Sequence, residues 1–174
     1  MLVYIVPTYD CNLNCNGCYA QKYKIQFDGY LSWEDFIKIY TKFKNCDKFA
    51  FIGGEPAKCK FINEAILYLK NKGKKVIVFT NATMPIHVKP TNIVVNGTNL
   101  FNNSIKHQII ERIESYRSQG SKITLRFNID DQFTEEMTKE AVSISKEQAD
   151  SVSISILFPA KLSRNLGDSV YFPL

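Results

Sequence analysis

The strongest constraint on the fold of this chain is a regular alternation between short apolar runs and longer amphipathic segments. The run 75–80, Lys-Val-Ile-Val-Phe-Thr, is continuously apolar between its ends, as expected of a strand that is buried on both faces. Five further runs have the length and composition of strands: 2–6, 48–52, 92–95, 123–129 and 151–158. Because mostly helical segments separate these runs, the pattern predicts right-handed crossover connections and a parallel α/β sheet.

Helical periodicity marks four of the connecting segments. Ser32 opens the first helix, with Asp35 three positions later in a capping-box position, and apolar residues recur from Trp33 to Phe43. Three further helices are expected: one through Ala65–Leu69 that stops at Gly73, one from Ile105 to Gly120, and one from Thr134 to about Gln148.

Composition limits the class of protein. A chain of 174 residues with 45% hydrophobic and 22% charged residues is typical of one globular domain, here residues 1–174. Lysine and arginine together number 22 against 17 acidic residues, a net charge of +5, but the lysines are scattered rather than clustered. This distribution argues against nucleic-acid binding.

Cysteine usage and the absence of targeting signals indicate a cytoplasmic protein. No apolar run approaches the roughly 20 residues of a membrane helix, so no membrane partner is expected. The start of the chain, residues 1–6, lacks the basic leader and cleavage site of a signal peptide. Five cysteines, three of them crowded together, do not resemble a disulfide framework and suit a reducing compartment.

Cys11, Cys15 and Cys18 lie in one short loop after the first expected strand. Three thiolates can converge from such a loop, and no fourth ligand lies nearby in the sequence. A closed zinc site takes four ligands, and ordinary iron–sulfur clusters take four cysteines. The spacing suggests a four-iron cluster with one iron left open for a small molecule, although by itself it also fits a metal site of another kind.

The segment Gly53-Gly54-Glu55-Pro56 follows the second expected strand. It belongs with the cysteine loop at the carboxyl edge of the sheet, where parallel α/β folds collect their functional groups. Two glycines let a ligand approach the backbone closely, and the carbonyls together with the Glu55 carboxylate form a receptor for an ammonium group. Taken alone, the motif also fits an ordinary turn.

Together the Cys-x3-Cys-x2-Cys loop and the Gly-Gly-Glu-Pro segment resemble the radical S-adenosylmethionine (SAM) superfamily. The resemblance implies a partial (β/α)6 TIM-like barrel of parallel strands, with its last helix missing or replaced by the C-terminal tail. It also implies that a [4Fe–4S] cluster bound by the three cysteines is chelated by SAM at its open iron. The reduced cluster would cleave SAM to methionine and a 5′-deoxyadenosyl radical, which abstracts hydrogen from substrate. The SAM amino group would be bound by Gly53, Gly54 and Glu55.

Three further residues are candidate SAM ligands by the same resemblance. Apolar residues alternate along 123–129, so Arg126 lies on the opposite face of that strand, inside the barrel if the apolar face packs on helices. There it suits the SAM carboxylate, as a strand-five arginine does in peptide-modifying members; the alternative is an exposed arginine on an edge strand. Asn81 and Asn96 follow the third and fourth strands, where members often place polar residues toward SAM, although a plain turn fits Asn96 nearly as well.

Several residues have two interpretations. Tyr19 either shields the cluster or packs the loop, and Gly17 stands where many members of the family have an aromatic residue. Cys46 is expected to be a buried apolar residue, whereas Cys59 is favoured as a core residue but lies close enough to the rim to modify substrate. The apolar ending 168–174 either tucks back onto the sheet or leads into further chain.

The expected function is that of a radical SAM enzyme. The Cys-Asn-Leu-x-Cys loop, the helix start at Leu31–Glu34 and Arg126 resemble the peptide-modifying branch, which implies a peptide or protein substrate. No cysteine follows Cys59, so the auxiliary-cluster (SPASM-like) extension of that branch is absent from this sequence. The family also implies an external electron donor such as flavodoxin or ferredoxin. Alternatives are a glycyl-radical-enzyme activase, a small-molecule radical SAM enzyme, or a non-enzymatic SAM-binding iron–sulfur regulator or carrier.

Overall fold

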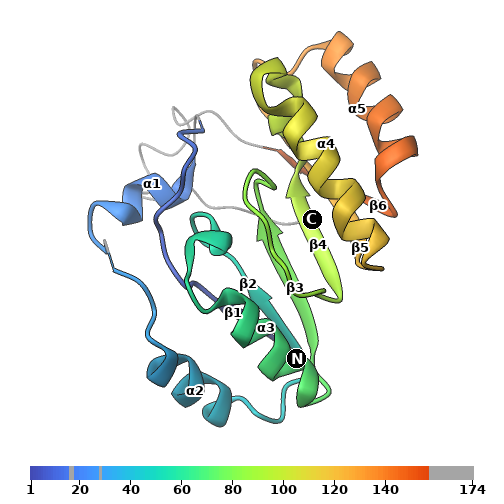
Figure 1. Ribbon diagram of the computed structural model, residues 1–174. Helices are drawn as coiled ribbons and strands as arrows, with labels where there is room; N and C mark the ends of the chain where they lie inside the picture. The colour runs from blue at the N-terminus through green and yellow to red at the C-terminus, as the bar shows by residue number, and fades with distance from the viewer. Residues whose placement is uncertain (16–17, 28, 157–174) are drawn as a thin grey trace.

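Six parallel strands form one open sheet in the computed structural model, which describes residues 1–15, 18–27 and 29–156. The strands follow one another across the sheet in chain order, and every neighbouring pair is parallel. The predicted parallel α/β fold is confirmed, and its curved sheet with outer helices is a partial (β/α)6 barrel (Figure 1). The strands are β1 (Leu2–Ile5), β2 (Lys48–Phe51), β3 (Lys75–Thr80), β4 (Asn92–Asn96), β5 (Lys122–Ile129) and β6 (Ser151–Ile156).

The helices agree with the four predicted from periodicity and add one. Ser32 caps α2 by accepting a hydrogen bond from the Asp35 backbone N–H at 3.0 Å, as its capping position predicted. The helix α1 and two short 3₁₀ turns were not predicted, because each is too brief to show periodicity. The elements are α1 (Tyr19–Lys24), α2 (Trp33–Lys42), η1 (Pro56–Lys58), α3 (Ile62–Asn71), η2 (Gly97–Phe101), α4 (Asn103–Ser118) and α5 (Glu135–Gln148).

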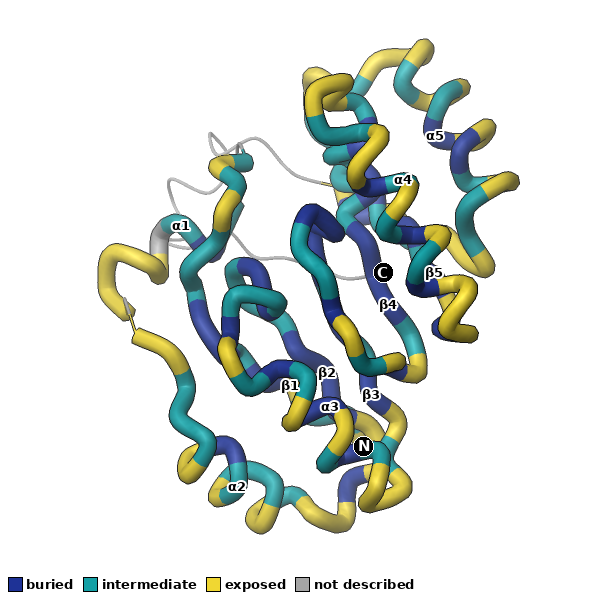
Figure 2. Tube along the Cα trace, in the orientation of Figure 1, coloured by how far each residue is buried: buried dark blue, intermediate teal, exposed yellow. Residues whose placement is uncertain are grey.

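The hydrophobic core lies between the outer face of the sheet and the helices that cover it (Figure 2). In β3, Val76 and Val78 are fully buried in this core, whereas Ile77 and Phe79 are only partly buried. The expectation that this strand is buried on both faces was therefore wrong. Alternate side chains of β3 face the concave side of the sheet, which the described residues leave partly open.

Three apolar side chains on the outer face of β6 are about half exposed. Val152, Ile154 and Ile156 are 49%, 54% and 55% exposed. The predicted absence or replacement of the helix after β6, and the apolar ending 168–174, lie outside the described residues. No helix in the part of the chain that the structure describes is long and apolar enough to span a bilayer.

Candidate functional site

The loops that follow β1 and β2 lie side by side at the carboxyl edge of the sheet, joined by backbone hydrogen bonds. The Gly54 N–H donates to the Thr8 carbonyl at 2.9 Å, and the Glu55 N–H donates to the Asp10 carbonyl at 2.8 Å. The segment that leads into the cysteines is thus held by the glycine-rich segment, as the sequence predicted for two loops on one rim.

Gly53 and Gly54 allow this close contact between the two loops. Gly53 has a φ of +134°, a conformation that favours glycine, and a Cβ there would lie 2.5 Å from the Thr8 carbonyl oxygen. A Cβ on Gly54 would overlap the Asp10 carbonyl oxygen. The two glycines are therefore approached by the backbone of the residues immediately before Cys11, which the sequence-based expectation of a ligand approach did not include.

The Glu55 side chain is fully buried and points toward the end of β3. Its Oε1 accepts hydrogen bonds from the Ala57 N–H at 3.0 Å and the Thr80 hydroxyl at 2.8 Å, and its Oε2 accepts one from the Asn81 N–H at 2.8 Å. Burial raises the pKa of this carboxyl, and the three hydrogen bonds oppose that rise. The carboxylate of Glu55 thus connects the loop after β2 with η1 and with the end of β3.

The three loop cysteines are free and partly buried. The Cys11 Sγ accepts hydrogen bonds from the Leu13 N–H at 3.4 Å and from Asn81 Nδ2 at 3.6 Å, and the Cys15 Sγ lies 3.6 Å from Asn99 Oδ1. Burial raises the pKa of both thiols, and the neighbouring cysteines add to the rise at Cys15. The loop thus places the Cys11 and Cys15 sulfurs against residues that follow β3 and β4.

Three soft sulfur donors from one loop fit a cluster that takes three protein ligands and leaves a position open. Within the described ranges, no three histidine, cysteine or acidic side chains are close enough to hold a metal ion. In the part of the chain that the structure describes, the thiols of Cys11, Cys15 and Cys18 do not converge on a common centre.

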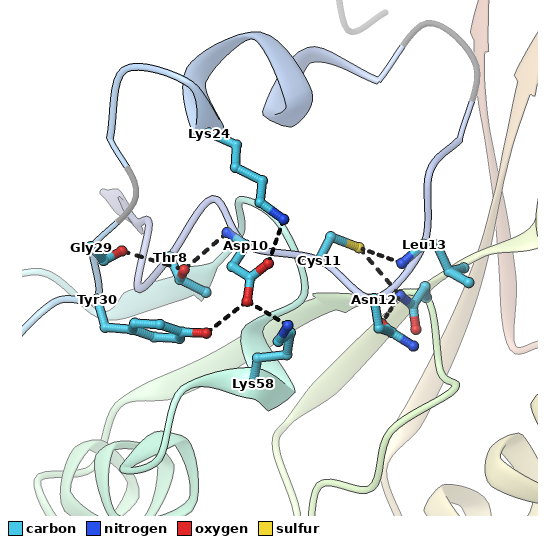
Figure 3. A network of polar contacts seen from close by, with 10 residues as sticks. Thr8, Asp10, Cys11, Asn12, Leu13, Lys24, Gly29, Tyr30 and Lys58 are labelled. Atoms are coloured by element: carbon cyan, nitrogen blue, oxygen red, sulfur yellow. Dashed lines mark hydrogen bonds and ion pairs between the residues drawn. The ribbon is translucent and has the colours of Figure 1, made fainter.

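Asp10 anchors the residue before the first cysteine, and sequence analysis did not identify it. Its carboxylate accepts hydrogen bonds from Lys24 Nζ and the Tyr30 hydroxyl, each at 2.7 Å, and forms an ion pair with Lys58 (Figure 3). These contacts, first that of Lys24, hold the pKa of Asp10 well below its usual range. The three partners are distant in the sequence, so no local pattern could have identified this network.

A second network joins the loop to the residues after β3. Asn81 Nδ2 donates to Asn12 Oδ1 at 3.0 Å, Asn12 Nδ2 donates to the Thr83 hydroxyl at 2.7 Å, and that hydroxyl donates to Asn81 Oδ1 at 2.6 Å. The three side chains form a closed ring of hydrogen bonds. Asn81, predicted as a cofactor ligand, is 7% exposed and lies directly beside Cys11.

Asn96, the last residue of β4, pairs in register with Arg126 in the middle of β5. The buried Asn96 Oδ1 has no hydrogen-bond partner among the described residues. The Arg126 Nε and Nη2 donate to the Ser155 hydroxyl at 2.9 and 2.7 Å, and the guanidinium lies 6.0 Å from the centre of the Phe79 ring. The predicted alternation of β5 is confirmed, because Arg126 shares the concave face with Phe79 while Leu125 and its alternate neighbours are buried.

The remaining candidates are resolved in part. The Tyr19 hydroxyl donates to the Gly53 carbonyl at 3.3 Å, so Tyr19 packs the cysteine loop against the glycine-rich segment. Cys46 and Cys59 are each 2% exposed within the hydrophobic core, which confirms the core interpretation of both. Gly17 lies outside the described residues.

Comparison with known proteins decides the family. Residues 5–130 match the profile of the Radical SAM superfamily, a span that contains both motif loops. The chain belongs to the radical SAM superfamily. The predicted family is therefore confirmed, and with it an enzyme class whose members use a [4Fe–4S] cluster and SAM.

Individual relatives of this radical SAM chain are distant. Fe-coproporphyrin III synthase of Methanosarcina barkeri is 25% identical over 143 residues, a match that covers 72% of this chain and 36% of that protein. Streptococcus suis SuiB bound to precursor peptide SuiA is 17% identical with a TM-score of 0.74, over 98% of this chain and 42% of SuiB. TYW1 with a lysine-pyruvate adduct is 14% identical with a TM-score of 0.66, over 94% of this chain and 67% of TYW1. The chain thus spans about two fifths of the length of SuiB and less of the synthase.

Proposed function

We propose that this chain is a SAM-cleaving radical enzyme that binds its cluster through Cys11, Cys15 and Cys18 and acts on a peptide or protein. The family match over residues 5–130 carries this proposal. The position of the cysteine loop supports it, since the Cys11 and Cys15 sulfurs lie against residues that follow β3 and β4. When bound, the cluster supplies the electron that splits the SAM sulfonium.

Residues at the carboxyl edge of the sheet each bind a different group of SAM. The backbone carbonyls of Gly53 and Gly54 receive the amino group. Glu55 holds this segment in position, because its carboxylate already accepts three hydrogen bonds from the protein. The unpartnered Asn96 Oδ1 accepts from a ribose hydroxyl. Arg126 binds the SAM carboxylate. To do so, its guanidinium exchanges its hydrogen bonds to the neutral Ser155 hydroxyl for hydrogen bonds to the charged carboxylate.

A peptide substrate is supported by two observations. The fold resembles that of SuiB, whose structure contains a precursor peptide, over 98% of this chain. The concave face also carries Tyr4, 58% exposed, beside the partly buried Phe79, an apolar surface that suits a side chain of a substrate. The similarity to Fe-coproporphyrin III synthase favours a small-molecule substrate as the second candidate.

The proposed reaction also requires a source of electrons and a reducing compartment. An external donor such as flavodoxin or ferredoxin supplies the electron, and a reducing cytoplasm keeps the five free thiols of the chain intact.

Anaerobic reconstitution with iron and sulfide, followed by dithionite and SAM, tests the activity. We expect a [4Fe–4S] signal whose spectrum changes on addition of SAM, and release of 5′-deoxyadenosine. Cys15→Ala should abolish both, whereas Cys46→Ala, a change in the core, should abolish neither. Binding of zinc alone contradicts the proposal, and a SAM-responsive cluster without 5′-deoxyadenosine supports the non-enzymatic carrier. Adding a candidate precursor peptide or a porphyrin then distinguishes the two substrate classes by which one increases SAM cleavage.

A further inference from the structure

Two asparagine side chains contact cysteine sulfurs from outside the cysteine loop. Asn81, directly after β3, places its Nδ2 3.6 Å from the Cys11 Sγ. Asn99, in η2 after β4, places its Oδ1 3.6 Å from the Cys15 Sγ. Because sulfur is a large atom, both separations are hydrogen-bonding distances. The amides thus approach two neighbouring ligand sulfurs from two different strand ends.

The orientation of the Asn81 amide is set by its other contacts. Its Oδ1 accepts from both the backbone N–H of Thr83, at 2.9 Å, and the Thr83 hydroxyl, at 2.6 Å. The side of the amide that donates is therefore the one that faces Cys11, with its second proton on Asn12 Oδ1. The backbone N–H of Asn81 is held in turn by the Glu55 carboxylate.

The Asn99 amide is poised to donate in the same way. In the free-thiol state the Cys15 thiol donates to Asn99 Oδ1, and the buried Asn99 Nδ2 has no partner within the described part of the chain. A thiolate bound to iron can only accept hydrogen bonds. Turning the amide about its last bond brings Nδ2 to the sulfur, which satisfies a buried donor that is otherwise costly to leave unpaired.

We propose that Asn81 and Asn99 donate hydrogen bonds to the ligand sulfurs of the cluster and raise its reduction potential. Reduction adds negative charge that the cysteine sulfurs share, so donors to these sulfurs stabilise the reduced cluster more than the oxidised one. The two asparagines are positioning residues that make the cluster easier to reduce. This inference rests on the proposed function, because it requires that the loop holds a redox-active cluster.

An EPR-monitored redox titration of the reconstituted full chain, without SAM, tests the inference. Asn81→Ala and Asn99→Ala should each lower the ratio of reduced to oxidised cluster at a fixed potential about tenfold, a shift of about 59 mV for one electron, and the double variant should shift further. Asn81→Asp is the second variant at this site, since it keeps both acceptor bonds to Thr83 while it removes the donor. It should lower the potential at least as much.

Two matched controls separate hydrogen bonding from loop packing. Asn12→Ala opens the ring but keeps both of the asparagines that contact the sulfurs, and Asn92→Ala removes an asparagine at the far end of β4, where it bonds Thr124. Both should keep the wild-type potential. Provided that the wild type binds an intact cluster, two results overturn the inference. One is a reduction potential that is unchanged in the Asn81 and Asn99 variants, and the other is a shift in Asn12→Ala as large as theirs. Failure of the wild type itself to bind a [4Fe–4S] cluster overturns the proposed function instead.

Discussion

Gly53 and Gly54 show how single residues determine the position of the cysteine loop. The glycines let the Thr8–Asp10 backbone come into direct contact with the glycine-rich segment, and two backbone hydrogen bonds close that contact. A side chain at either position would occupy space that the neighbouring loop already fills. The need for glycine at this rim therefore arises from packing between loops, in addition to any approach by SAM.

Gly54→Ala should destabilise the protein and reduce its cluster content. The new Cβ has to displace the Asp10 carbonyl, which breaks its hydrogen bond with the Glu55 N–H and shifts Cys11. We expect a loss of about 1–3 kcal/mol in the free energy of unfolding, measured in urea, with less iron bound per chain. Gly29→Ala is the matched control, because a Cβ there meets nothing within 4 Å. Equal stability of the two variants would show that the loops separate easily.

Glu55 connects three secondary-structure elements through one buried carboxylate. It follows β2, caps η1 through the Ala57 N–H, and binds Thr80 and Asn81 at the end of β3. Because Asn81 in turn contacts Cys11, the carboxylate is linked to the cysteine loop through the end of β3. Glu55 therefore acts as a structural junction between these elements as well as a part of the binding site.

Glu55→Ala should lower the free energy of unfolding by about 3 kcal/mol or more, because it leaves three hydrogen-bond donors without their acceptor. Urea denaturation of the apo protein measures this loss. Glu114→Ala, which removes an exposed glutamate of α4, should change stability by less than about 0.5 kcal/mol. If Glu55→Ala leaves stability intact and weakens only SAM binding, the carboxylate serves the cofactor directly and its structural role is refuted.

Across the molecule, the site and the hydrophobic core are separate. The core fills the space between the sheet and its outer helices and contains Cys46 and Cys59, whereas the three loop cysteines lie outside it. The networks that hold the cysteine loop use polar contacts at the rim. We therefore expect the fold to form without the cluster.

Replacing Cys11, Cys15 and Cys18 together by serine should abolish cluster binding and preserve the fold. We expect an unchanged far-UV circular dichroism spectrum and a free energy of unfolding within about 1 kcal/mol of the apo wild type, since the three positions lie outside the core. Cys59→Ser should destabilise more, because it buries a hydroxyl in the core. Loss of the folded spectrum in the triple variant would show that the loop contributes to the core.

Local patterns were sufficient for most of the fold. The strand Lys75–Thr80 has the predicted bounds, the cap at Ser32 forms, and both motif loops follow the strands expected of them. These features depend on residues that are neighbours in the sequence, where periodicity, capping and turn chemistry act directly. The three cysteines and the glycine-rich segment were identifiable for the same reason, since each is a short contiguous motif.

The tertiary structure alone decided how these motifs are held. Asn81 meets Cys11 across 70 positions of sequence and Glu55 across 26, and Asp10 finds its partners in α1, η1 and the segment before α2. The partial exposure of Ile77 and Phe79 likewise depends on what covers the concave face. A residue pattern records which side of an element is apolar, but which side chains meet is determined by how the crossover connections place the strand ends beside one another.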